Sequence, residues 1–172
     1  MTDQRVNHTI RRAKPSDLSG MIKLLGILFS IETDFVVDEG TQQRGLEMML
    51  ADGTNRCIMV AEINQHVVGM CTAQMLVSTA EGGIVALIED LVVEDEWRGE
   101  GIGKELLLSA GNWAITRGVT RLQLLADRNN VGALEFYEKM DWEITRMICL
   151  NKKSGICGTP LSVLTTQSKL AE

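Results

Sequence analysis

The chain has 172 residues, of which 45% are hydrophobic, and its formal net charge is −6. This length and composition suit a single globular domain over residues 1–172, and the acidic balance excludes the basic surface that a nucleic-acid partner needs. The N-terminal residues show no apolar signal segment, and the apolar run from Met21 to Ile31 is too short to span a bilayer. We therefore expect a cytoplasmic protein that neither binds nucleic acid nor enters a membrane.

The cysteines and histidines form no metal-binding pattern. The four cysteines are far apart and make no C-x-x-C pair, and the chain has two histidines. We therefore expect no metal site. Three cysteines lie in strand-like apolar runs, where we expect them to be small buried hydrophobes: Cys57, Cys71 and Cys149.

The first half of the chain predicts a strand, two helices and a β-hairpin. After Pro15, which favours a helix start, apolar residues recur at helical spacing from Leu18 to Leu28. Asn64 and Gln65 separate two apolar runs and predict a tight turn. The expected elements are a strand over His8–Arg12, helices from Leu18 and over Thr41–Leu50, and strands over Cys57–Glu62 and His66–Val77.

The second half predicts alternating strands and helices. Ile84–Val93 is a nearly continuous apolar run in which Glu89 and Asp90 break the pattern of a buried strand. The elements expected after it are a helix over Gly101–Arg117, a strand over Arg121–Ala126, a helix from Asn130 and a strand over Trp142–Leu150. The tail over 151–172 is expected to be a last strand, with Leu161–Thr166 as its candidate, or a mobile end.

A glycine loop between the strand ending at Val93 and the next helix predicts an anion site. Arg98 is followed by glycines at alternate positions, Gly99, Gly101 and Gly103. Glycine allows positive φ and close approach of a ligand, and the helix start adds free N–H groups and a partial positive charge. The spacing excludes a P-loop, because Arg98 occupies its first glycine position. It also excludes a dinucleotide loop, because Lys104 occupies the third glycine position.

Two motifs point to one enzyme family. Arg98, Gly101 and Gly103 fit the pattern Arg-x-x-Gly-x-Gly. Within Asn129–Trp142, the residues Asn130, Ala133 and Tyr137 are spaced to share one helix face. In this order the motifs resemble the pyrophosphate loop and the second signature of the GNAT superfamily, the acetyl-CoA-dependent N-acetyltransferases. Asp141 stands where the family usually has glycine, and Asp tolerates the left-handed conformation of that turn.

The resemblance implies a fold and a reaction. The fold is α/β, with a GNAT-type mixed central sheet flanked by helices and splayed between its two central strands. Those strands carry Leu91 and Val93 on one side and Leu122 and Leu124 on the other, and the wedge between them would hold the pantetheine arm of acetyl-CoA. The implied reaction is transfer of acetyl from this cosubstrate, without a metal, to a primary amine of a small molecule or peptide. Homodimers are common in the superfamily, and the oligomeric state of this chain stays open.

The resemblance also implies roles for single residues. Glu89 would be the general base, directly or through water, and Tyr137 the general acid for the CoA thiolate. On a regular strand Glu89 shares a face with Leu91 and Val93, and Asp90 faces the other side. The alternative is that Glu89 is a surface carboxylate or a salt-bridge partner. The residues expected around acetyl-CoA are Leu91, Val92, Val93, Arg98, Gly99, Glu100, Gly101, Ile102, Gly103, Lys104, Asn130, Ala133 and Tyr137.

An acidic segment between the first two helices offers a candidate acceptor site. It carries four carboxylates and no basic residue, and in the GNAT fold this connection often lines the acceptor site. Asp34, Asp38 and Glu39 would attract a cationic amine such as a polyamine, an aminoglycoside or a lysine side chain; the alternative is a solvated acidic loop. Two other functions stay open: a non-catalytic acyl-CoA sensor or interaction module on the same fold, and transfer of an acyl group other than acetyl.

Overall fold

The computed structural model describes residues 7–32 and 34–152. Strands and helices follow the predicted order as far as the last helix. In chain order the elements are β1 (Thr9–Arg12), the 3-10 turn η1 (Pro15–Asp17), α1 (Leu18–Ile31), α2 (Glu39–Ala51), β2 (Arg56–Ile63), β3 (His66–Ser78), β4 (Gly83–Val93), the 3-10 turn η2 (Asp95–Trp97), α3 (Ile102–Ile115), β5 (Leu122–Leu124) and α4 (Val131–Glu138).

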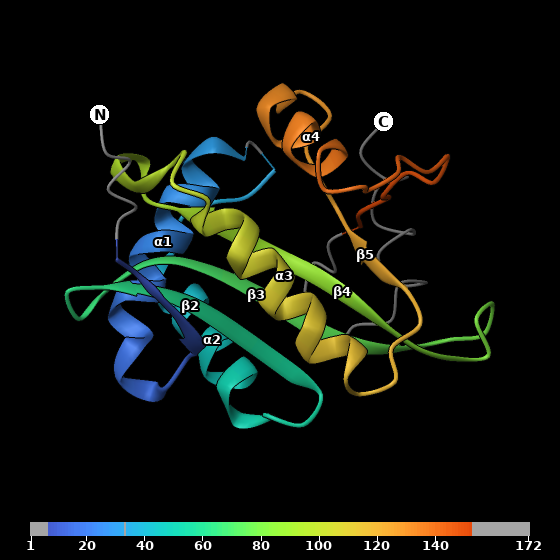
Figure 1. Cartoon of the computed structure of the whole chain (residues 1–172), viewed down its shortest axis with the longest axis horizontal. Coiled ribbons are helices and arrows are strands. Elements are labelled where there is room, and N and C mark those ends of the chain that lie inside the picture. Colours follow the sequence, from blue (N-terminus) through green and yellow to red (C-terminus); the bar gives the residue numbers. More distant parts are fainter. Residues whose placement is uncertain (1–6, 33, 153–172) are drawn as a thin grey trace, which may run out of the picture. The chain divides into compact units, whose positions relative to one another are not determined.

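The strands form a five-stranded sheet in the order β1-β2-β3-β4-β5 (Figure 1). Neighbours from β1 to β4 are antiparallel and β4 pairs with β5 in parallel, which confirms the mixed sheet. The β2–β3 hairpin turns at Asn64 and Gln65, whose φ angles of 48° and 66° match the twist of the flanking strands. The tight turn predicted at these two residues is confirmed.

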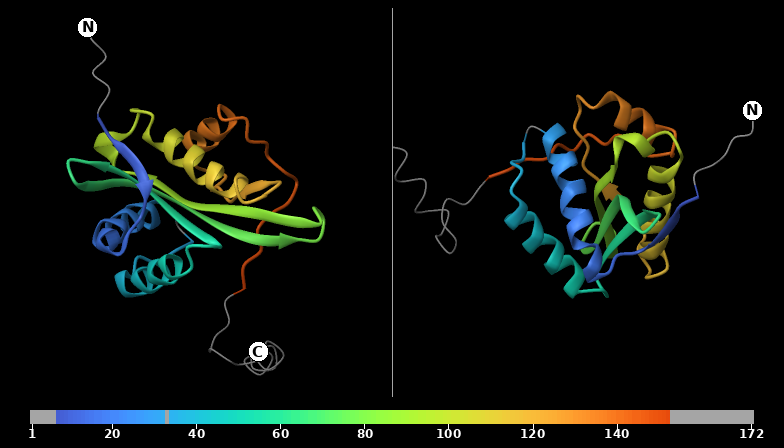
Figure 2. Two further views of the ribbon diagram at one scale, coloured as in Figure 1. Left: turned by 60° about the horizontal axis from the view of Figure 1, so that its bottom comes forward. Right: turned by 90° about the vertical axis from the view of Figure 1, so that its left-hand side faces the viewer.

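Helices cover both faces of the sheet, with α1 and α2 on one face and α3 on the other (Figure 2). The face under α1 and α2 has its own apolar cluster, in which Met21, Leu24 and Leu46 pack with Val60 and Met70 of the strands. Burial of one such side chain contributes about 1.5–3 kcal/mol, so this stripe is enough to hold each helix on the sheet.

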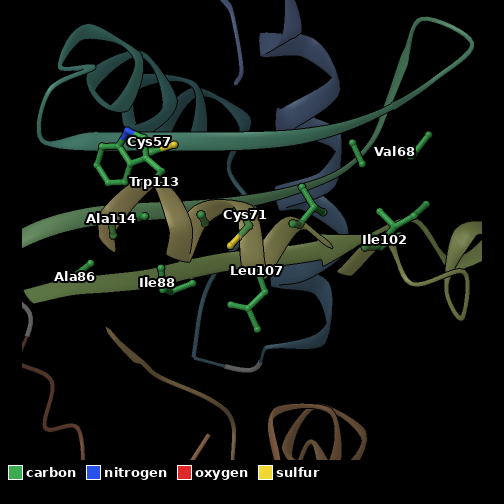
Figure 3. Close-up of a cluster of buried hydrophobic side chains, with 14 of the residues drawn as sticks. Cys57, Val68, Cys71, Ala86, Ile88, Ile102, Leu107, Trp113 and Ala114 are labelled. Carbon is green, nitrogen blue, oxygen red and sulfur yellow. The ribbon is translucent and has the colours of Figure 1, made fainter. Parts of the chain in front are cut away.

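The second apolar cluster lies under α3. Figure 3 shows Leu107, Trp113 and Ala114 of this helix over the strands that carry Cys71 and Ile88. Gly69 of β3 lets the helix approach closely, because a Cβ at this position would lie 3.1 Å from Leu106 Cδ1 and 3.1 Å from the main-chain oxygen of Val92. Helix α3 is therefore seated directly on the central strands, and the loop before it is held at the end of β4.

The predicted splay between the two central strands is confirmed. β4 pairs with β5 only where Ala86–Ile88 faces Leu122–Leu124. Beyond Ile88, β4 continues to Val93 beside β3, but within the described ranges it has no partner strand on its other side. The main-chain groups of the last part of β4 are therefore left open on the side that faces away from β3.

Two predicted strands differ from the structure. β5 is shorter than the expected Arg121–Ala126, and Trp142–Leu150 forms no strand, so that prediction is wrong. The physical reason is the lack of a packing surface: the large apolar side chains of this segment are exposed, by 86% for Ile144 and 85% for Met147. An apolar run without a neighbouring strand satisfies neither its side chains nor its main-chain groups.

The chain divides into two units, Met1–Trp142 and Glu143–Glu172, and every element named above lies in the first. That the whole chain forms one domain stays a prediction. The candidate strand Leu161–Thr166 and Cys157 lie outside the described residues. No helix in the described part of the chain is both long and apolar enough to cross a membrane.

Candidate functional site

The glycine loop leads directly from the open end of β4 into α3. Gly99 and Gly101 both have a φ of 85°, and Gly101 is the N-cap of the helix. A Cβ at either position would meet nothing within 4 Å, so glycine is needed here for its conformation and not for space. The first hydrogen bond at this helix start runs from Glu105 N to Gly101 O at 3.1 Å, which leaves the N–H groups of the first turn without a partner inside the helix.

Arg98 is tied to the strand from which the loop departs. Its Nε donates to the main-chain oxygen of Val93 at 3.0 Å, and its Nη2 lies 2.8 Å from Asp95 Oδ1. The side chain is 48% exposed, so part of the guanidinium stays accessible to an anion. Arg98 therefore anchors the loop to β4 and also gives it a positive charge. Its Nε is the hydrogen-bond donor to the Val93 carbonyl.

Helix α4 supplies the second predicted motif. Asn130 caps this helix, with Oδ1 accepting from the Ala133 N–H at 3.1 Å. Tyr137 makes edge contacts with Phe136 and Trp142, at centroid distances of 5.3 and 6.1 Å. After the helix, Asp141 adopts a φ of 62°, so the left-handed turn predicted for this residue is confirmed.

The Tyr137 hydroxyl lies in a mostly buried environment. The pKa of Tyr137 is raised to about 12, mainly by burial and to a smaller extent by Cys71 and Glu32. The phenol is therefore protonated at neutral pH and can act as a hydrogen-bond donor or an acid. The Tyr137 side chain packs against the apolar cluster under α3.

A β-bulge interrupts β4 at the two acidic residues. Thr72 pairs with Glu89 and Met70 pairs with Val92, so two residues of β4, Asp90 and Leu91, lie opposite one residue of β3. Asp90 has a φ of 50°, in the left-handed region. The extra residue shifts the alternation of the strand: Ala86 and Ile88 pack in the cluster under α3, and after the bulge Leu91 and Val93 do so.

The bulge places both carboxylates on one face. Glu89 Oε2 accepts from Gln74 Nε2 at 3.2 Å, and Asp90 Oδ2 accepts from Thr72 Oγ1 at 3.0 Å. Thr72 and Gln74 alternate along β3 with residues that pack under α3, so they face α1. The expectation that Glu89 shares a face with Leu91 and Val93, with Asp90 opposite, is wrong because it assumed a regular strand.

Glu32, the first residue after α1, joins these carboxylates. Burial is the main cause that raises its pKa, followed by the charges of Asp90, Asp127, Asp34 and Glu89. In the described ranges none of these five residues forms a salt bridge. The sequence pattern placed Glu32 in the acidic segment but did not single it out, because the charges of Asp90 and Glu89 act on it only in the folded chain.

The rest of the acidic segment has a different environment. Asp38 is the N-cap of α2, with Oδ1 accepting from the Thr41 N–H at 2.7 Å, and this hydrogen bond lowers the pKa of Asp38. Asp34 and Glu39 are exposed. Asp38 therefore has a structural role as the N-cap of α2.

The cysteines match the expectation only in part. Cys57 and Cys71 are buried, and burial raises the pKa of both thiols. Cys149 is exposed, so the expectation is wrong for this residue, because the strand that would bury it does not form. Across 7–32 and 34–152, no three His, Cys, Asp or Glu side chains are grouped so that they could hold a metal ion.

Known proteins resemble this chain in sequence and in fold. The sequence model of the Acetyltransferase (GNAT) family matches residues 24–142. An uncharacterised N-acetyltransferase of Archaeoglobus fulgidus is 30% identical over 134 residues, which cover 77% of this chain and 90% of that protein. A glucosamine 6-phosphate N-acetyltransferase of Trypanosoma brucei brucei is 30% identical over 147 residues, covering 81% and 91%. The solved aminoglycoside N-acetyltransferase AAC(6')-Iy in complex with CoA shares the fold, with a TM-score of 0.75, 15% identity, and coverage of 89% of this chain and 99% of that chain.

This chain combines a splayed mixed sheet and a glycine loop after its central strand with a sequence match to N-acetyltransferases. The family match runs from within α1 to the turn after α4 and includes both motifs. The chain is therefore a member of the GNAT family, an acetyl-CoA-dependent N-acetyltransferase.

Proposed function

We propose that the protein moves the acetyl group of acetyl-CoA to a primary amine by direct attack, with Glu89 as base and Tyr137 as acid. The observation that carries this proposal is the arrangement at the end of β4. The strand is unpaired beyond Ile88, runs into the glycine loop, and carries Glu89 on the face toward α1. Donor-binding groups and a proton acceptor thus come from one short segment.

The reaction needs a base because the amine is protonated. An alkyl amine has a pKa of about 10.4, so its neutral form at pH 7 is disfavoured by roughly 4–5 kcal/mol. Glu89, directly or through water, would take the ammonium proton while the nitrogen forms a bond to the acetyl carbonyl carbon. The carbon–sulfur bond then breaks, and Tyr137 would give its proton to the thiolate. The second proton that the nitrogen loses as the amide forms would restore the phenol.

The proposed acetyl-CoA site follows the end of β4, the loop and the start of α4. The free N–H groups at the start of α3 and the guanidinium of Arg98 suit the pyrophosphate. Main-chain groups on the open side of β4 suit the pantetheine and the thioester carbonyl. The residues proposed are Leu91, Val92, Val93, Arg98, Gly99, Glu100, Gly101, Ile102, Gly103, Lys104, Asn130, Ala133 and Tyr137.

The acceptor proposed is a cationic amine. Glu32, Glu89 and Asp90 influence one another electrostatically and, in the described part of the chain, have no basic partner. An ammonium group would relieve this repulsion, whereas a phosphate would add to it. The proposal therefore favours a polyamine, aminoglycoside or lysine amine over the phosphorylated sugar of the trypanosomal relative, with Asp34, Asp38 and Glu39 as weaker contributors.

The test is release of the CoA thiol with a panel of acceptors. The panel includes spermidine, an aminoglycoside, a lysine peptide, glucosamine 6-phosphate and a neutral aromatic amine, each with acetyl-CoA. We expect release with at least one cationic acceptor and the least with the phosphorylated sugar. Tight binding of acetyl-CoA without release of CoA in the presence of any acceptor would contradict the proposal and favour a non-catalytic acyl-CoA sensor. Faster release from a longer acyl-CoA would contradict the acetyl preference.

A further inference from the structure

The bulge residue of β4 combines an unusual main-chain conformation with a specific side-chain contact. Asp90 has a φ of 50°, which a non-glycine residue adopts at a cost and which is uncommon inside a strand. Thr72 of β3, the pairing partner of Glu89, is only 1% exposed, and its hydroxyl donates to Asp90 Oδ2 at 3.0 Å. A strained residue in a strand therefore has one buried donor that favours its position.

The bulge matters because it decides where the neighbouring groups point. Without it, Glu89 and Asp90 would lie on opposite faces, and Leu91 would leave the cluster under α3. Glu89 precedes the bulge and lies on the face of α1, where Gln74 donates to its carboxylate, and the bulge brings Asp90 to that same face. The same turn of the main chain sets the direction of the open groups at the end of β4.

We propose that the hydrogen bond from Thr72 to Asp90 positions the catalytic strand: it holds the bulge that turns the main chain of Leu91 immediately after Glu89. Asp90 is on this view a positioning residue that acts through its neighbours. The inference rests on the proposed acetyl transfer, because it concerns the aim of the groups that carry out that reaction.

Charges around Asp90 make this contact sensitive to protonation. Three titratable groups interact electrostatically with Asp90: Glu89 on β4, Cys71 on β3 and Glu32 after α1. The pKa of Asp90 is raised to about 6, mainly by burial; the hydrogen bond from Thr72 opposes this rise by favouring the carboxylate, and the charge of Glu89 adds to it. Removing the Thr72 hydroxyl should therefore raise this pKa further and move the acidic limb of the activity profile to higher pH.

The test compares two pairs of variants. Thr72→Val removes the donor at constant shape, and Thr72→Ser keeps a hydroxyl. Asp90→Asn keeps an acceptor and a residue type that tolerates positive φ, and Asp90→Ala keeps neither. We expect kcat for Thr72→Val to fall at least tenfold below that of Thr72→Ser, and Asp90→Ala at least tenfold below Asp90→Asn. We expect KM for acetyl-CoA to change less than threefold, and the acidic limb to move up by about one pH unit in Thr72→Val.

Other outcomes would overturn the inference. Equal losses in the two Thr72 variants would show that the hydroxyl has no positioning role. Equal losses in Asp90→Asn and Asp90→Ala would make Asp90 itself a proton acceptor. If Thr72→Val fails to fold, the Asp90 pair decides alone.

Failure of the proposed function would be seen separately: the wild-type protein would release no CoA from acetyl-CoA with any acceptor. The contact would then be judged by ¹³C NMR titration of the Asp90 carboxyl. A higher pKa in Thr72→Val than in Thr72→Ser would support the contact, and equal values would contradict it.

Discussion

Arg98 donates from Nε to the main-chain oxygen of Val93 at 3.0 Å, so the first charged residue of the glycine loop is bonded to the last residue of β4. This contact joins the two parts of the proposed donor site, the open strand end and the start of α3. It also means that the loop conformation is set before a ligand arrives, which lowers the entropy that binding must overcome.

Substitution of Gly101 tests the loop. Gly101→Val forces a β-branched residue into a φ of 85° at the helix N-cap, so the free N–H groups should turn away from the pyrophosphate. We expect KM for acetyl-CoA to rise at least tenfold. Gly118→Val is the matched control, because Gly118 has a φ of 84° and equally open space beyond the other end of α3.

Both glycine variants should lose similar stability, of about 1–2 kcal/mol, in thermal or denaturant unfolding. Only Gly101→Val should lose affinity for acetyl-CoA. A normal KM in folded Gly101→Val, or an equal rise in both variants, would remove the loop from the donor site.

Tyr137→Phe tests the proposed acid. The substitution keeps the ring contacts with Phe136 and Trp142 and removes only the hydroxyl. Because a thiol has a pKa of about 8.5, the thiolate leaves without much help, and we expect kcat to fall only about tenfold. Binding of acetyl-CoA, measured by calorimetry, should change less than kcat. Wild-type turnover in this variant would exclude Tyr137 from the mechanism.

Glu32→Gln tests the cationic acceptor. Removing this half-buried charge near Glu89 and Asp90 should raise KM for a cationic amine several-fold and leave a neutral amine less affected. Glu47→Gln is the control, because Glu47 is an exposed carboxylate further along α2. A loss of the same size with neutral and cationic amines would contradict an electrostatic role for Glu32.

Neutralising Asp34, Asp38 and Glu39 together tests the acidic segment as a whole. Asp38→Asn alone must accompany the triple variant, since the triple change also alters the cap of α2. Selective loss of activity on cationic amines, beyond that of Asp38→Asn, would support the segment as part of the acceptor site. No difference between the two would leave it a solvated loop.

Asp90 should make stability depend on pH in a direction opposite to that of a paired carboxylate. Its pKa is raised from 3.8 to about 6, so the folded state binds a proton more readily than the unfolded chain. The unfolding free energy therefore falls as pH rises from about 4 to about 6, and the loss is complete above pH 6. Asp90→Asn removes this penalty, and we expect it to be more stable than the wild type at pH 8 by up to about 2–3 kcal/mol.

The same difference should vanish near pH 4, where the wild-type carboxyl is protonated. Denaturant unfolding at the two pH values measures both quantities. A variant that is less stable than the wild type at pH 8 would show that the charged form of Asp90 is not disfavoured by burial.

Much of the fold followed from local patterns. The hairpin at Asn64 and Gln65, the helix that begins after Gly101 and the left-handed turn at Asp141 depend on turn and cap residues close in sequence. The strand predicted over Trp142–Leu150 failed because an apolar run indicates what could be buried and does not supply a neighbour to bury it.

The sequence by itself determined the family and the donor, because the spacing of Arg98, Gly101 and Gly103 is read along one continuous segment. Only the tertiary structure decided the surroundings of the carboxylates. One extra residue in β4 turned Asp90 to the face of Glu89, and the fold brought Glu32, which follows α1, within the electrostatic influence of both. The reason is physical: main-chain loops are specified by conformations of adjacent residues, whereas side-chain direction in a sheet depends on register with a partner strand, which no local pattern contains.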